Sequence, residues 1–248
     1  VSIIPTCTVQ LTDPATGYVE TDQITYATGF ATASYTPDNG TTNTPMAATT
    51  DVRLDVVYPS DGAFTPPTTP RPVVLLIHGG GWTNNLWPNN SAACSVQPSA
   101  DRCEILAVAH KLANYYGVAA VNVEYPLLTN TGAKNAAPNP EEAVLCALRW
   151  TKGHAADGTF GALGIDPARV MVTGYSAGSQ LAAWLWAIGS SGQAATYDNA
   201  NCPYSSISSG PAGNASVKAG APMYGFYKLD DFTGGSIVAG HLNCTNPN

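Results

Sequence analysis

The chain has 248 residues, of which only 11% are charged, and its formal net charge at pH 7 is −7. This length is sufficient for one large α/β domain with a sizeable core. Without a Lys/Arg cluster to neutralise phosphates, an acidic chain of this kind is a poor candidate for nucleic-acid binding. No apolar run approaches the roughly 18 residues that a membrane-spanning helix needs.

Apolar runs and helical patterns alternate along the chain. Residues 1–50 are rich in Thr, Pro and Gly, and we expect an irregular N-terminal arm there with an edge strand near 24–30; residues 51–248 then form a single domain. Strands are predicted at 51–58, 72–77, 118–123, 170–172 and within 219–229, helices at 101–116, from 140 and after Ser176, and a turn at 164–169. Such alternation is typical of βαβ units. The predicted fold class is therefore α/β, with a mostly parallel central sheet and helices on both faces.

The six cysteines favour an oxidised protein over one with buried free thiols. They occupy positions 7, 94, 103, 146, 202 and 244, without a C-x-x-C pair. An even number in a chain so poor in charge favours a secreted protein, extracellular or periplasmic, with up to three disulfides. We expect a local Cys94–Cys103 bridge, and pairing of Cys244 within the chain, with Cys202. Glycosylation sequons at Asn39, Asn89, Asn214 and Asn243 support secretion only slightly, because such matches arise freely in a chain rich in Asn and Thr.

The sequence Gly174-Tyr-Ser-Ala-Gly178 lies between an apolar run and an alanine-rich helical segment. Strand, sharp turn and helix form the context of a nucleophile elbow, in which flanking glycines let the backbone bend and present the serine hydroxyl. The pentapeptide alone is weak evidence, and its context makes Ser176 the candidate nucleophile.

Three glycines, Gly79, Gly80 and Gly81, directly follow the predicted buried strand at 72–77. Acyl transfer passes through a tetrahedral oxyanion, which needs N–H donors about 2.7–3.1 Å from its oxygen. Glycines after a strand can aim such donors, because no Cβ obstructs the ligand. A nucleotide-phosphate loop is an alternative, but neither G-x-G-x-x-G nor G-x-x-x-x-G-K-[ST] is present. The other alternative is that the three glycines form only a structural turn.

These motifs together resemble the hormone-sensitive-lipase-like branch of the α/β-hydrolase superfamily. The resemblance rests on His78-Gly-Gly-Gly-Trp82 and Gly174-Tyr-Ser-Ala-Gly178, with support from Val123-Glu-Tyr-Pro-Leu127 and Asp166-Pro-Ala-Arg-Val170. It covers roughly residues 50–230. It implies an α/β-hydrolase fold and a serine carboxylesterase that needs no cofactor and no metal.

The resemblance also implies roles for individual residues. Ser176 would be the nucleophile, and the N–H groups of Gly80, Gly81 and Ala177 would form the oxyanion hole. His78 would be structural, orienting the glycine loop rather than acting as the base. We further expect Trp82 and Trp87 to line the acyl or alcohol site, and Trp184 and Trp186 to lie in the core.

The triad acid and histidine are not identifiable by this resemblance. Members of the family place them, in that order, after the last two strands of the sheet. Here His241 is the only histidine after Ser176, and Asp230 and Asp231 precede it with no recognisable strand between. We therefore expect a C-terminally incomplete domain that lacks the last strands, with the site completed by a continuation or a separate fragment. The alternative is that His241, with Asp230 or Asp231, replaces the missing pair.

The predicted function is a secreted carboxylic ester hydrolase acting on a small-molecule ester through an acyl-serine intermediate. One alternative is a catalytically silent α/β-hydrolase relative that serves as a binding or structural protein. Another is an enzyme of a different acyl-transfer class, such as a peptidase or thioesterase. The serine and glycine motifs favour an enzyme, whereas the unlocated acid and histidine favour the silent relative.

Overall fold

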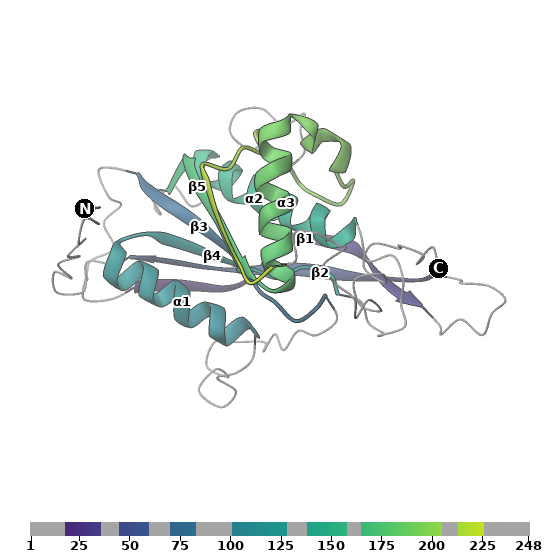
Figure 1. The fold of residues 1–248 in the computed structure, drawn as a ribbon, viewed down its shortest axis with the longest axis horizontal. Coiled ribbons are helices and arrows are strands. Elements are labelled where there is room, and N and C mark those ends of the chain that lie inside the picture. The colour runs from purple at the N-terminus through teal and green to yellow at the C-terminus, as the bar shows by residue number, and fades with distance from the viewer. Residues whose placement is uncertain are drawn as a thin grey trace, which may run out of the picture.

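A computed structural model describes residues 18–35, 45–59, 70–82, 101–127, 138–157, 165–204 and 213–225. The strands of this part of the chain form a six-stranded mixed sheet in the order β1-β2-β4-β3-β5-β6 (Figure 1). Its strands are β1 (Tyr18–Tyr35), β2 (Pro45–Pro59), β3 (Arg71–Ile77), β4 (Ala119–Val123), β5 (Ile165–Tyr175) and β6 (Ala219–Met223). The helices are α1 (Asp101–Tyr116), α2 (Asn139–Asp157), α3 (Ala177–Ser191) and the 3₁₀ helix η3 (Gln193–Tyr197).

Strands β4, β3, β5 and β6 are parallel to one another, whereas β2 runs antiparallel to both β1 and β4. The parallel part is the βαβ pattern expected from the sequence, since helices connect these strands. The N-terminal region expected to be mostly irregular contains strand residues 18–35 and 45–50. Residues 24–30 lie in β1, at the edge of the sheet.

Alternate residues of β3 face two different helix layers. Val73, Leu75 and Ile77 belong to the core cluster that includes side chains of α2 and α3. Val74 and Leu76 belong to a smaller cluster with side chains of α1. A strand covered on both faces reads as a continuous apolar run, as this one does. The prediction of helices on both faces is confirmed.

The turn predicted at 164–169 is an insertion in β5. Ile165 pairs with Arg71 and Val170 with Val73, so four residues of β5 lie opposite one of β3. The Asp166 carboxylate accepts hydrogen bonds from the Ala168 N–H at 2.8 Å and Arg169 Nε at 2.7 Å. These bonds lower the pKa of Asp166, and the bond from the Arg169 side chain has the largest effect.

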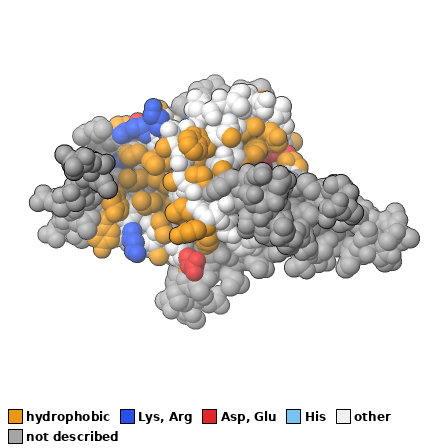
Figure 2. All heavy atoms as spheres, viewed as in Figure 1, with side chains coloured by type: hydrophobic (Ala, Val, Ile, Leu, Met, Phe, Trp, Pro, Cys, Tyr) orange, Lys and Arg blue, Asp and Glu red, His pale blue; other side chains and the backbone are white. Residues whose placement is uncertain are grey.

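The α1 face of the sheet is partly uncovered in the described structure. A groove of about 310 Å³ runs between α1, β3 and the ends of β5 and β6. Met171 and Met223 on this face are 36% and 46% exposed. Figure 2 shows hydrophobic side chains gathered over this region.

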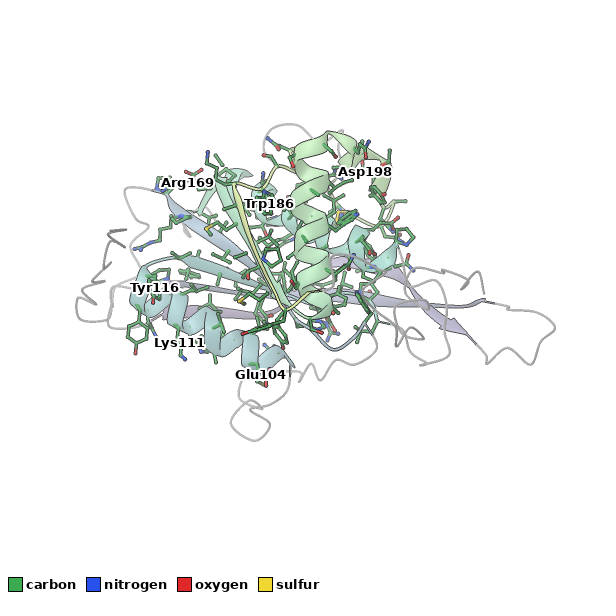
Figure 3. All side chains as sticks on the ribbon, viewed as in Figure 1. Glu104, Lys111, Tyr116, Arg169, Trp186 and Asp198 are labelled. Carbon is green, nitrogen blue, oxygen red and sulfur yellow. A yellow bond between two sulfur atoms is a disulfide. The ribbon has the colours of Figure 1, made fainter. Side chains whose placement is uncertain are left out.

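The tryptophan predictions are corrected in part. Trp186 is 43% exposed and rests on Gly220 of β6, where a Cβ would lie 2.6 Å from its ring (Figure 3). It is therefore not a core residue, because α3 places this side chain over β6, at the edge of the described sheet. Trp184 does pack against the core. Trp82 is buried in the core cluster with 3% exposure, so it is part of the scaffold rather than an open site wall. Trp87 lies outside the described residues.

One disulfide joins α2 to the segment after η3. Cys146 and Cys202 are bonded across 56 positions of sequence. The expected Cys202–Cys244 pair is therefore wrong, because the Cys202 sulfur is already bonded to a cysteine of α2. Cys103 is also disulfide-bonded, but Cys94 lies outside the described residues, so the predicted Cys94–Cys103 pair stays a prediction.

Within the described ranges, no helix combines the length and apolar character needed to cross a membrane.

Candidate active site

Ser176 stands at the junction of β5 and α3 in a strained backbone conformation. Its φ and ψ are 53° and −122°, a region that residues other than glycine rarely adopt. Its N–H donates a hydrogen bond to the Met223 carbonyl at 3.1 Å, and its carbonyl accepts the N–H groups of Ser179 and Gln180. The backbone of this residue is thus fixed by β6 on one side and by the first turn of α3 on the other. The side chain is half-buried.

The two glycines of the elbow lie where no side chain fits. A Cβ on Gly174 would lie 2.4 Å from the Gly178 carbonyl oxygen and 2.7 Å from that of Ile77. A Cβ on Gly178 would lie 2.2 Å from the Ile77 oxygen and 2.3 Å from the His78 oxygen. The turn before α3 therefore packs backbone to backbone against the end of β3. This close approach is the reason for glycine at both positions of the motif.

The glycine loop after β3 lies beside this elbow. Gly80 and Gly81 have φ values of 94° and 61°, and Trp82 follows at 59°. Gly79 lies against the Tyr175 ring, which leaves no room for a Cβ. Gly80 and Gly81 are half-exposed. The loop thus keeps its glycine backbone accessible while Trp82 fastens its far end in the core.

His78 is a buried scaffold residue. It is fully buried, its ring stacks on Tyr125 with centroids 4.2 Å apart, and its Nδ1 lies 2.9 Å from the Gly79 carbonyl oxygen. Because a carbonyl only accepts, Nδ1 carries the hydrogen. Burial lowers the pKa of His78 to about 4, which the bond to Gly79 only partly opposes. A neutral imidazole committed to its own loop fits the structural role that the resemblance implied.

Glu124 and Tyr125 follow β4, and Tyr125 reaches the same loop region. The Tyr125 hydroxyl lies 2.8 Å from the Gly79 oxygen and 3.0 Å from the His78 oxygen. The Glu124 carboxylate accepts the Arg53 N–H at 3.2 Å, and its carbonyl accepts the Tyr26 hydroxyl at 2.7 Å. Burial raises the pKa of Glu124 to about 7, against the lowering influence of Arg53.

A buried ion pair fixes the start of α1. Arg102 bonds Asp55 through Nε at 2.9 Å and Nη2 at 2.8 Å, and both side chains are fully buried. Asn122 adds a third donor to the same carboxylate at 3.0 Å. Three donors from α1 and β4 thus hold a carboxylate of β2, which compensates for burying the charge.

The match to a family model identifies the family of this chain. The BD-FAE family model matches residues 54–240, which include β3, the glycine loop and the elbow. This chain belongs to the BD-FAE family. The six-stranded sheet, the helices on both faces and the strand–turn–helix at Ser176 confirm the predicted α/β-hydrolase fold.

Several relatives of this BD-FAE chain are esterases by name. The carboxylic ester hydrolase LipN of Mycobacterium tuberculosis is 32% identical over 125 residues, which is 50% of this chain and 26% of LipN. The acetyl ester-xyloside bifunctional hydrolase from Caldicellulosiruptor lactoaceticus is 19% identical, with a TM-score of 0.48 over 80% of this chain and 57% of that one. Esterase LipW from Mycobacterium marinum is 26% identical, with a TM-score of 0.39 over 58% of this chain and 36% of LipW. The BD-FAE chain thus spans only about a quarter to just over half of these relatives.

The structure of this BD-FAE member brings together only part of the predicted site. Ser176 and Ala177 lie at the elbow, which contacts the chain immediately before Gly80 and Gly81. The remaining candidates, His241, Asp230 and Asp231, lie outside the described residues. Asp198, the aspartate after Ser176 that is described, forms an ion pair with the buried Arg149. No group of three or more His, Cys, Asp or Glu side chains among the described residues is arranged to hold a metal.

Sequence analysis missed the role of Tyr125 in the glycine loop. The residue was noted only as part of a strand-end motif. The sequence shows only that Tyr125 comes two residues after a predicted buried strand, and the pairing of that strand with β3 supplies the rest. The parallel register pairs Val123 with Ile77, which places Tyr125 beside Gly79.

Proposed function

We propose that this chain carries the nucleophile and oxyanion-hole part of a carboxylic ester hydrolase that works through an acyl-serine intermediate. The observation that carries the proposal is the strained Ser176 elbow, packed directly on an accessible glycine loop. Strain at a residue that glycine would relieve is retained where the side chain has a function. The name of LipN, a carboxylic ester hydrolase, supports the same reaction class.

In the proposed reaction, the Ser176 hydroxyl oxygen attacks the ester carbonyl carbon, and its proton passes to a general base. The carbonyl electron pair moves onto oxygen, and the N–H groups of Gly80, Gly81 and Ala177 stabilise that charge. Collapse of the intermediate breaks the bond to the alcohol oxygen, which leaves protonated. Water then attacks the acyl-serine and releases the acid by the same route.

The base is not one of the described histidines. His78 is buried against Gly79, and the His110 ring is bonded to Glu20 at 2.7 Å. His154 lies in the last turn of α2 and stacks on Trp150. We propose His241 as the candidate to test within this sequence, with a base outside these 248 residues as the alternative.

A combined assay and labelling experiment tests the proposal. The native protein should hydrolyse p-nitrophenyl acetate and butyrate, and a phosphonate probe should label Ser176 in peptide mass spectra. Ser176→Ala should lose both labelling and on the order of 10⁶ in kcat, by analogy with other serine hydrolases. The control Ser190→Ala, on the last turn of α3, should retain both. Unlabelled native protein without esterase activity would favour the silent-relative alternative. Retained turnover in His241→Ala would place the base elsewhere.

We also propose that the protein works in an oxidising compartment, outside the cell or in the periplasm. The Cys146–Cys202 bond supports this, because cytosolic thiols are usually kept reduced. Non-reducing peptide mapping of protein taken directly from its source, with free thiols blocked at lysis, tests it. Blocked, unpaired Cys146 and Cys202 would contradict the proposal.

A further inference from the structure

We infer that Tyr125 is a positioning residue that sets the direction of the Gly80 N–H in the oxyanion hole. The inference rests on the proposed function. Tyr125 is 1% exposed and lies behind the glycine loop, so it does not itself meet a substrate. Its hydroxyl is shared between the carbonyl oxygens of Gly79, at 2.8 Å, and His78, at 3.0 Å.

The Gly79 carbonyl is held by two donors at once. The Tyr125 hydroxyl approaches its oxygen at 2.8 Å and His78 Nδ1 at 2.9 Å. A carbonyl oxygen has two lone pairs, so these two donors occupy both. The stacking of His78 on Tyr125, with ring planes 9° apart, keeps the two donors in a fixed relation to each other. The oxygen is therefore restrained on the side facing the core.

Fixing this oxygen fixes the next N–H group. The peptide between Gly79 and Gly80 is planar, and in a trans peptide the C=O and N–H point in opposite directions. A carbonyl pulled toward the core therefore turns the Gly80 N–H away from it, toward the outer side of the loop. Gly80 is half-exposed.

The glycines make such an external restraint necessary. Gly80 and Gly81 adopt φ values of 94° and 61°, which glycine reaches freely but does not prefer over others. Without a hold on the Gly79 carbonyl, the peptide could rotate among several orientations, and a donor would have to be reoriented during each turnover. Donors that are already oriented avoid that reorganisation, and this preorganisation is the main source of oxyanion stabilisation. A phenylalanine would fill the same core volume but would not hold the carbonyl.

The chain offers a matched control. Tyr26 is also fully buried, and its hydroxyl also donates to a backbone carbonyl, that of Glu124 at 2.7 Å. Removing the Tyr26 hydroxyl takes a donor from one backbone carbonyl, that of Glu124, and removing the Tyr125 hydroxyl takes it from two, those of Gly79 and His78. Only Tyr125 touches the glycine loop.

The experiment compares Tyr125→Phe and Tyr26→Phe with the native protein in p-nitrophenyl acetate hydrolysis, phosphonate labelling and urea unfolding. We expect kcat of Tyr125→Phe to fall roughly 10- to 100-fold while KM stays within about twofold, and phosphonate labelling to slow in parallel. This fall is smaller than the loss of kcat that follows deletion of a whole oxyanion donor. Tyr26→Phe should lose similar stability with kcat unchanged. If Tyr125→Phe does not fold, 3-fluorotyrosine at position 125, which changes donor strength with little change in size, should alter kcat.

The outcomes separate this inference from the proposed function. Native protein that neither hydrolyses the ester nor reacts with the phosphonate would overturn both. Active native protein with unchanged kcat in Tyr125→Phe, or in the fluorotyrosine protein, would overturn the inference alone. An equal fall of kcat in Tyr26→Phe would reduce Tyr125 to a general stability role and so also overturn it.

Discussion

A Cβ added to Gly178 would lie 2.3 Å from the carbonyl oxygen of His78, closer than real Cβ atoms come to any such atom. The turn after the nucleophile and the glycine loop are therefore in direct backbone contact. Because both sides of the contact are backbone atoms, displacement of one segment displaces the other.

Gly178→Ala should disturb both segments. The added methyl group overpacks a backbone contact, so we expect a loss of about 1–3 kcal/mol in unfolding free energy. Esterase activity should fall by about 10²-fold, because displacement of reacting groups by about 1 Å has that effect. Urea unfolding measures the change in unfolding free energy, and p-nitrophenyl acetate hydrolysis measures the change in esterase activity.

Gly192→Ala is the control for that substitution. Gly192 has a φ of 74° with open space around it, at the end of α3. It should lose about 1 kcal/mol from backbone strain and keep full activity. Equal activity in Gly178→Ala and Gly192→Ala would mean that the backbone contact does not matter for catalysis.

Ser176→Gly and Ser176→Ala should be equally inactive but differ in stability. Both lack the hydroxyl, whereas only glycine adopts a φ of 53° and ψ of −122° without strain. We expect Ser176→Gly to unfold at a higher urea concentration than Ser176→Ala, by roughly 1 kcal/mol or more. A glycine variant no more stable than the alanine variant would contradict strain at the elbow.

The sequence was sufficient for the parts of the site that depend on local chain geometry. Gly174 and Gly178 flank a serine between a strand and a helix, and these features are close together in the chain. Tyr125 could not be assigned in the same way, because its contact with Gly79 depends on which strands are neighbours. The Cys146–Cys202 pair depends likewise on the packing of α2 against the segment after η3. Such long-range pairings are set by tertiary packing, which local patterns do not record.

Glu124→Gln should remove a pH-dependent loss of stability. Burial raises the folded-state pKa of Glu124 to about 7 from an ordinary value of 4.5. Between these values the folded protein binds more protons than the unfolded chain, so stability contributed by the protonated form is lost as pH rises. The variant should be more stable than the native protein at pH 8, by about 1–3 kcal/mol, and equal to it near pH 4.5.

Urea unfolding of both proteins from pH 4.5 to 8 measures that difference. His78, whose pKa burial lowers to about 4, contributes the opposite slope between pH 4 and 6.5 and does so in both proteins. Its effect therefore cancels in the comparison. Parallel curves for the two proteins would mean that Glu124 ionises normally.

Replacing the Cys146–Cys202 bond should lower stability without moving the elbow. The bond closes a long loop, because the two cysteines are 56 positions apart, so Cys146→Ala with Cys202→Ala should lose about 2–4 kcal/mol. Unfolding under non-reducing conditions measures this. Because Cys103 is also disulfide-bonded, reductant should lower the stability of the double variant further. A double variant as stable as the native protein would show that the bond is dispensable.

The partly uncovered face of the sheet has a consequence for handling the protein. Met171 and Met223 are both exposed there, and Tyr175 pairs with Met223 across the strand ends. Exposed methionines are converted to sulfoxides by peroxides, which makes an apolar side chain polar. The carbonyl of Met223 also holds the Ser176 N–H, so oxidative ageing would alter the residue that supports the nucleophile. The protein should therefore be stored without peroxides. The mass of the peptide that contains Met223 reports how far this residue has been oxidised.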